Sequence, residues 1–139
     1  MSQCIFCKII NKEIPGHVVY EDEFVLAFLD ISQSTKGHTL VIPKKHAQDV
    51  FSMTAEDMSH VFSIVPKLAN ALKTTFNCNG LNVVNNNGVA AGQTVFHYHV
   101  HLIPRYDETD GFSNSYANNM ENYTPEMLAA LKEEVIKSL

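Results

Sequence analysis

Three histidines in the second half of the chain, His97, His99 and His101, alternate with apolar residues. Successive side chains of a β-strand point to opposite faces, so this spacing predicts a strand over 95–103 with the three imidazoles on one face. Imidazoles about 6–7 Å apart along a strand can act as nucleophile, orienting partner and proton donor. The residues between them would supply the core from the other face: Phe96, Tyr98, Val100 and Leu102.

Two alternative interpretations of these histidines are weaker. A single exposed strand histidine often has no task, but three in strict alternation beside a glycine-containing loop are poorly explained in that way. A catalytic zinc ion held by all three is disfavoured, because side chains two residues apart on one straight strand do not converge on a single ion.

The loop before the histidines suits close approach to a ligand. Gly88 to Gly92 contains no residue larger than valine, so its backbone amides can come near an anion. Gln93 and Thr94 add side-chain donors at its end. Backbone amides can hold a phosphate without any lysine, so the loop and the histidine face together predict a phosphate site.

The charge distribution limits the classes of partner. The 139 residues carry 10 basic and 15 acidic side chains, a net charge of −5 with neutral histidines. Residues 107–139 hold seven of the acids and two of the bases, so residues 1–106 are balanced. A balanced body with one arginine, Arg105, argues against a nucleic-acid partner.

Composition also bears on the compartment. No apolar run approaches the roughly 20 residues that span a bilayer, and no signal peptide is recognisable, so no membrane partner is expected. Three cysteines, an odd number, favour a reducing cytoplasmic environment over a disulfide framework.

The segments around the motif predict one α+β domain with an antiparallel sheet. Strands are expected over 17–20, 24–29, 38–42 and 81–84, the first two as a hairpin. Helices are expected over 4–12, over 54–76 with a kink or division at Pro66, and from Pro125 after the cap residue Thr124. The last helix is expected to turn Leu128, Leu131 and Val135 inward.

Several motifs together resemble those of the histidine triad (HIT) superfamily of nucleotide-binding proteins, in particular bacterial members close to the Hint branch. The resemblance runs from Cys4 to about Arg105 and covers these segments: Ile5-Phe6, Lys8-Ile9-Ile10, Glu13-Ile14-Pro15, Phe28 to Ile31, Gly37 to His46, Asn86-Asn87-Gly88, Gly92 to Val95 and the three histidines. It implies a HIT domain over 1–106, with a long helix and a short N-terminal helix on the sheet. Residues 107–139 would then be an acidic C-terminal extension of that domain with a terminal helix.

The resemblance also implies roles for individual residues. His99 would attack the α-phosphorus of a nucleotide to give a nucleotidyl-histidine intermediate, with His101 at the phosphate and leaving group and His97 completing the triad. Phosphate contacts are implied for Asn86, Gly92, Gln93 and Thr94. Asp30 would hold the ribose hydroxyls. The base pocket would be shaped by Phe6, Ile9, Ile14, Phe28 and Ile31, although apolar residues in such segments are equally consistent with plain core.

The pair Cys4-x-x-Cys7 is a weak motif alone, because a redox pair normally follows a strand and a metal site needs further ligands. In HIT relatives with this pair, the resemblance implies zinc bound by the two cysteines, the histidine that ends Pro-Lys-Lys-His, and the first triad histidine. Here these are Cys4, Cys7, His46 and His97, a closed set suited to one structural ion per chain.

These expectations lead to a hydrolase or transferase that acts on nucleoside 5′-monophosphate derivatives. The resemblance favours purine nucleoside phosphoramidates, with AMP or an adenylated amine as the ligand. A dinucleoside polyphosphate hydrolase (Ap4A-type) is one alternative. A nucleotide-binding adaptor with incidental catalysis, suggested by the acidic extension, is another. The family resemblance further implies a homodimer.

Overall fold

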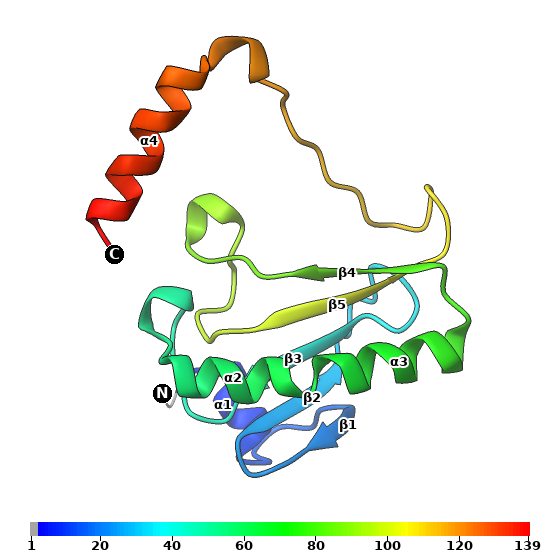
Figure 1. Ribbon diagram of the computed structural model, residues 1–139. Helices are drawn as coiled ribbons and strands as arrows, with labels where there is room; N and C mark the ends of the chain where they lie inside the picture. Colours follow the sequence, from blue (N-terminus) through cyan, green and yellow to red (C-terminus); the bar gives the residue numbers. More distant parts are fainter. Residues whose placement is uncertain (1–2) are drawn as a thin grey trace.

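The computed structural model describes residues 3–139, which form one five-stranded sheet, helices that cover its two faces and a C-terminal helix that stands apart (Figure 1). The strands are β1 (Val18–Glu21), β2 (Val25–Leu29), β3 (Thr39–Pro43), β4 (Gly80–Val84) and β5 (Val100–Arg105). The helices are α1 (Ile5–Ile10), α2 (Ala55–Ser63), α3 (Val65–Phe76) and α4 (Pro125–Lys137). The strand order is β1-β2-β3-β5-β4, and every neighbouring pair is antiparallel. The expected α+β fold is confirmed.

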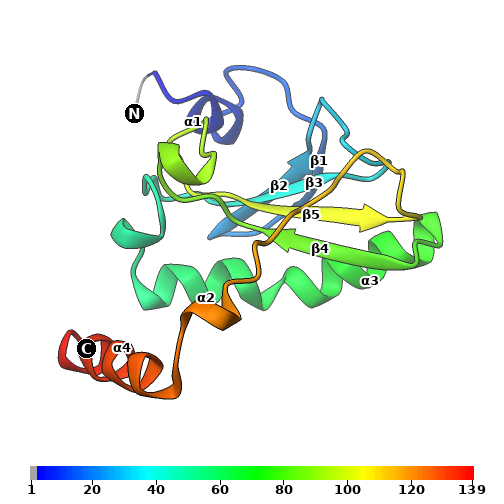
Figure 2. The same cartoon turned by 90° about the horizontal axis from the view of Figure 1, so that it is seen from above.

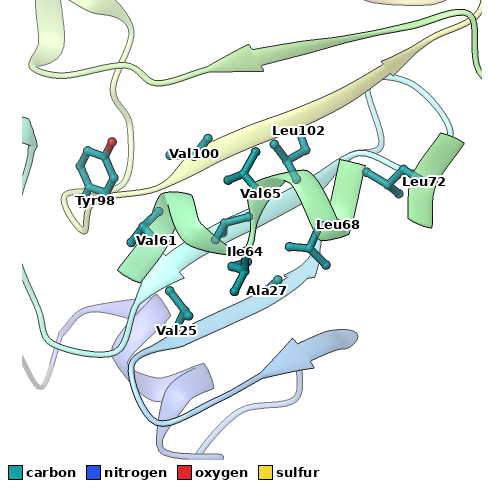
Figure 3. Packing of buried hydrophobic residues seen from close by; sticks show 11 residues of the cluster. Val25, Ala27, Val61, Ile64, Val65, Leu68, Leu72, Tyr98, Val100 and Leu102 are labelled. Atoms are coloured by element: carbon teal, nitrogen blue, oxygen red, sulfur yellow. The ribbon is translucent and has the colours of Figure 1, made fainter. Parts of the chain in front are cut away.

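Alternation along the strands separates two layers of core. In β2, Val25 and Ala27 pack under α2 and α3, while Leu26 and Phe28 pack with Phe6 of α1 on the opposite face. Figure 2 shows α1 on one side of the sheet and α2 with α3 on the other, and Figure 3 shows the larger cluster from close by. The α1 side is therefore the face on which polar side chains of β5 can reach a ligand.

The expected long helix is divided, as the proline predicted. Thr54 caps α2 by accepting a hydrogen bond from the Asp57 backbone N–H, and α2 ends at Ser63. Pro66 then lies in the first turn of α3, where its missing N–H removes no helical hydrogen bond. Both helices bury their apolar faces on the sheet.

The strand expected over 95–103 is wrong at its start, because β5 begins at Val100 and the chain bends before it. The β3–β5 ladder ends at Val41–Val100, and further along β3 the carbonyl of Pro43 accepts a hydrogen bond from the His97 ring at 2.8 Å. The His97 side chain thus makes the hydrogen bond to β3 that a backbone N–H of a longer β5 would have made. Phe96, expected in the core, is 40% exposed, whereas Tyr98, Val100 and Leu102 are buried as expected.

The terminal helix is present but does not turn inward. Thr124 caps α4 by accepting from the Met127 N–H, as expected. Leu128, Leu131 and Val135, however, are 54%, 46% and 63% exposed. Figures 1 and 2 show the reason, which is that an extended segment carries α4 away from the sheet. Among residues 3–139, no helix is long and apolar enough to cross a membrane.

Candidate active site

His99 lies just before β5 with its ring almost fully buried. Its Nδ1 is 2.7 Å from the carbonyl oxygen of His97, so we assign the ring proton to Nδ1. The edge-on ring of Phe6, with centroids 5.3 Å apart, covers one side. Burial lowers the pKa of His99 below its usual value. The result is a neutral imidazole whose Nε2 lone pair carries no proton near neutral pH.

His101 projects from β5 on the same face of the sheet and pairs with a fourth histidine. His38 Nε2 and His101 Nδ1 are 2.9 Å apart. The Ser34 backbone N–H donates to His38 Nδ1 at 3.3 Å, which makes that nitrogen an acceptor and places the His38 proton on Nε2. His101 Nδ1 must then accept, so the proton of His101 is on Nε2. Burial, with smaller contributions from the His99 and His38 rings, lowers the pKa of His101 to about 4.

Asp30 adjoins this pair. One carboxylate oxygen accepts hydrogen bonds from the backbone N–H and hydroxyl of Ser32, at 2.8 and 2.7 Å. The other oxygen lies 3.6 Å from His38 Nε2. Although partial burial opposes ionisation, the Ser32 hydrogen bonds bring the pKa of Asp30 below its usual value. Asp30 therefore offers one lightly used, ionised oxygen to a ligand hydroxyl.

His97, expected beside the other two histidines, turns instead into a separate cluster. Its ring is fully buried, and Nδ1 lies 3.4 Å from Cys4 Sγ, 3.6 Å from Cys7 Sγ and 3.1 Å from His46 Nδ1. Cys7 Sγ is also 3.4 Å from His46 Nδ1. The bend before β5 is what separates His97 from His99 and His101.

These four side chains fit a tetrahedral metal ion. Zinc bonds of about 2.3 Å to sulfur and about 2.0 Å to nitrogen hold tetrahedral donors roughly 3.3–3.8 Å apart. The four donor distances given above are 3.1–3.6 Å, and all four donor atoms lie within 4.8 Å of one another. The His97 ring donates from Nε2 to the Pro43 carbonyl, which leaves Nδ1 free as a ligand. Burial and the neighbouring thiol raise the pKa of Cys7 to about 11, so a cation is needed to hold its thiolate.

An apolar cleft of about 390 Å³ opens between α1 and the ends of β2 and β3, and it is lined by Phe6, whose ring also packs against His99. The volume lies within the range of small-ligand sites. All five residues expected at a base line it, namely Phe6, Ile9, Ile14, Phe28 and Ile31, and Asp30 lies at its edge. Phe6 and Phe28 are also core residues, whereas Ile31 is 91% exposed. The cleft therefore has a fixed floor and an open rim.

The small-residue loop is held in shape by Gln93. Its side-chain amide donates to the carbonyls of Gln48 and Val95, its side-chain oxygen accepts from the Gly88 N–H, and its own backbone N–H donates to the Gly88 carbonyl. Contrary to expectation, these bonds leave Gln93 no donor for a phosphate. Gly92 adopts a φ of +91°, which favours glycine.

The other two residues expected at the phosphate remain open to a ligand. Thr94 is exposed and Asn86 is half-buried. Two neighbours that the sequence did not single out fix the histidine backbone instead. Asn85 donates to the His99 carbonyl at 2.8 Å, and Asn87 donates to the Asn85 side chain at 2.6 Å. Asn85, Asn86 and Asn87 are consecutive, and the sequence around them does not show which of the three contacts the ligand and which holds the backbone.

Comparison with known proteins identifies the family. The HIT domain model matches residues 11–108. The chain is 54% identical over 138 residues to Protein hit of Bacillus subtilis, covering 99% of this chain and 95% of that protein. It is 42% identical over 110 residues to the adenosine 5′-monophosphoramidase of Saccharomyces cerevisiae, covering 79% of this chain and 67% of that protein.

Solved structures agree. The crystal structure of a HIT family protein from Bacillus anthracis has a TM-score of 0.96 at 58% identity, covering 99% of this chain and 97% of that chain. A zinc-bound histidine triad family protein from Mycobacterium smegmatis has a TM-score of 0.76 at 32% identity, with 99% of both chains covered. From its matched domain, its relatives and its fold, the chain belongs to the HIT family.

Proposed function

We propose that this protein hydrolyses nucleoside 5′-monophosphate derivatives at the α-phosphorus, with purine nucleoside phosphoramidates of the AMP type as substrates. The observation that carries the proposal is the free Nε2 of His99, held neutral and aimed by the bond from Nδ1 to the His97 carbonyl. A neutral imidazole so placed is a competent nucleophile. The adenosine 5′-monophosphoramidase of yeast, 42% identical, supports the substrate class.

In the first half of the reaction, His99 Nε2 attacks phosphorus while the bond from phosphorus to the amine breaks. The departing nitrogen accepts a hydrogen bond from the outward N–H of the His38–His101 pair, on His101 Nε2, and takes a proton from solvent water. In the second half, water attacks phosphorus and the bond to His99 breaks. The hydroxyl of that water stays on phosphorus and its other proton returns to solvent, so the protons balance and the enzyme is regenerated.

Binding of the nucleoside orients phosphorus for attack. The base would occupy the apolar cleft, and the ribose hydroxyls would donate to the free oxygen of Asp30. Asn86, Thr94 and Gly92 would meet the phosphate, while Gln93 acts as a positioning residue for that loop. Such fixed dipoles stabilise charge as it shifts in the transition state.

Turnover of an adenosine 5′-phosphoramidate tests this proposal, with diadenosine polyphosphate as the competing substrate. We expect release of AMP and free amine from the phosphoramidate at a kcat/KM well above that for the polyphosphate. The matched control is His60→Asn, which replaces a histidine of α2 that stacks on Phe24. This variant should keep full activity. Preferential cleavage of the polyphosphate would instead identify the other substrate class.

We also propose that Cys4, Cys7, His46 and His97 hold one structural zinc ion. The donor spacing and the free Nδ1 of His97 support it, as does the zinc-bound mycobacterial relative. When bound, zinc would supply the charge that stabilises the two thiolates. His97, through its backbone carbonyl, also orients His99. The cluster would therefore fasten α1 to the nucleophile, and metal content of protein purified without chelator tests this.

Finally, we propose a cytoplasmic homodimer built from a HIT domain over 1–106 and an extension over 107–139. The exposed apolar stripe of α4 supports association, since large apolar patches on a surface commonly mark protein interfaces. Sedimentation of the full chain tests the oligomeric state.

A further inference from the structure

The loop that leads into His38 is held from outside by the end of β5 and by the segment that follows it. The buried Thr35 hydroxyl donates to the Pro104 carbonyl at 2.6 Å. The Tyr106 hydroxyl donates to the Lys36 carbonyl, also at 2.6 Å. Two consecutive residues of this loop are thus tied to residues distant in sequence, Thr35 through its side chain and Lys36 through its backbone carbonyl.

Gly111 makes the third contact with the same loop. Its φ is +103°, and a Cβ added there would overlap the carbonyl oxygen of Ser34. Only glycine lets the chain pass so close to Ser34 in this conformation. The backbone N–H of Ser34 is the donor that fixes the His38 tautomer. Gly111 therefore abuts the residue that decides where the His38 proton lies.

The segment that carries Gly111 is itself closed by hydrogen bonds. Arg105 Nε donates to both carboxylate oxygens of Asp110, at 3.0 and 3.1 Å. The other guanidinium nitrogens donate to Asn82 of β4 and to the carbonyl of Phe112. Tyr106 donates its N–H to Asp110 at 2.7 Å. Residues 105–112 thus form a turn fixed to the sheet, which can hold the His38 loop in place.

We propose that Gly111 and Tyr106 are positioning residues for the His38–His101 pair. They fix the loop so that Ser34 keeps the His38 proton on Nε2 and hence the His101 proton on its outward nitrogen. Gly111 lies beyond residues 11–108 that match the HIT model, so the extension of this chain supplies part of the support. The effect on rate rests on the proposed function, because it requires His101 to serve a leaving group.

Steady-state kinetics of two variants test the rate effect. Gly111→Ala should displace Ser34 and lower kcat about tenfold with KM changed less than about twofold, since misplacement of a reacting group costs rate rather than binding. Tyr106→Phe, which removes one hydroxyl, should lower kcat about threefold. The matched controls are Tyr116→Phe, at an exposed position between β5 and α4, and Gly80→Ala, where an added Cβ meets nothing closer than 4.0 Å. Both should stay within twofold of the parent.

Histidine ¹⁵N chemical shifts provide a readout that needs no turnover. The parent should show His38 protonated on Nε2, and Gly111→Ala should show a mixture of tautomers. If this mixture is found in a protein that cleaves no phosphoramidate, the positioning stands and the proposed function fails. If Gly111→Ala folds but leaves the His38 signals and kcat unchanged, the inference is overturned. Should Gly111→Ala fail to fold, an unchanged His38 signal and kcat in Tyr106→Phe overturn it equally.

Discussion

The Nδ1 nitrogen of His99 lies 2.7 Å from the carbonyl oxygen of His97. This contact joins the two clusters of the molecule, because the His97 side chain belongs to the cysteine cluster while its backbone orients the nucleophile. A shift of the His97 side chain in the Cys/His cluster would therefore move its backbone carbonyl and, with it, the ring of His99.

Removal of a metal ligand should lower the thermal stability of the protein strongly and its kcat only modestly. Cys7→Ser should lose bound zinc and lower the midpoint of thermal unfolding by at least about 5 °C, since an ion that binds only the folded chain stabilises it. Because His99 and His101 remain, kcat should fall less than about tenfold. Zinc analysis and calorimetry measure the first effect. Cys78→Ser, a buried cysteine outside the cluster, is the control, and equal zinc in both variants would contradict the assignment.

Substitution of His38 should misplace the His101 N–H without removing the nucleophile. His38→Asn lacks the imidazole that donates to His101 Nδ1. We expect kcat to fall about 100-fold, a typical cost of losing one oriented hydrogen-bond donor to the transition state, with little change in KM. The affinity for AMP should be kept. A variant with parental kcat would exclude His38 from the mechanism.

Stability at low pH should depend on Asp110. Hydrogen bonds from Arg105 and the backbone lower the pKa of this carboxyl to about 2, against about 3.9 in the unfolded chain. A depressed pKa in the folded state gives stability that is fully present above about pH 4 and is lost as the pH falls toward 2. The midpoint of thermal unfolding of Asp110→Asn should therefore be lower than that of the parent at pH 7. The two midpoints should converge near pH 2. Glu108→Gln, at an exposed position in the same turn, should show no such convergence.

The apolar stripe of α4 should drive self-association. Leu131→Glu places a charge between Leu128 and Val135 on the exposed stripe. It should therefore raise the fraction of monomer measured by sedimentation. Lys132→Glu changes the charge of the same helix more strongly without altering the stripe, and should leave the dimer intact. A parent chain that sediments as monomer at all concentrations would contradict the homodimer.

Local pattern predicted most of the fold. Thr54, Pro66 and Pro125 marked helix boundaries correctly because caps and prolines act on their own backbone. The strand over 95–103 failed because its pairing depends on Pro43, which is distant in sequence and accepts from a side chain. The inward face of α4 failed for a related reason, since periodicity shows an apolar stripe but not what covers it.

The candidate site was predictable in its parts and less so in its connections. The residues that the family resemblance assigned to the base pocket and to a metal site do lie together in the structure. The tasks of Gln93, Asn85 and His38 depend on hydrogen bonds to carbonyls and rings far along the chain. No spacing in the sequence records such bonds, so the loop-holding role of Gln93 emerges only from the structure.

The central claim is that Nε2 of His99 attacks phosphorus, and the covalent intermediate tests it most directly. Adenosine 5′-phosphoramidate labelled in the nucleotide would be mixed with enzyme, quenched within one turnover and digested, and the labelled fragment mapped. We predict a nucleotidyl group on His99, absent from His99→Ala, which should also lose turnover. Turnover by the parent with no label on His99, or full activity in His99→Ala, would contradict the mechanism.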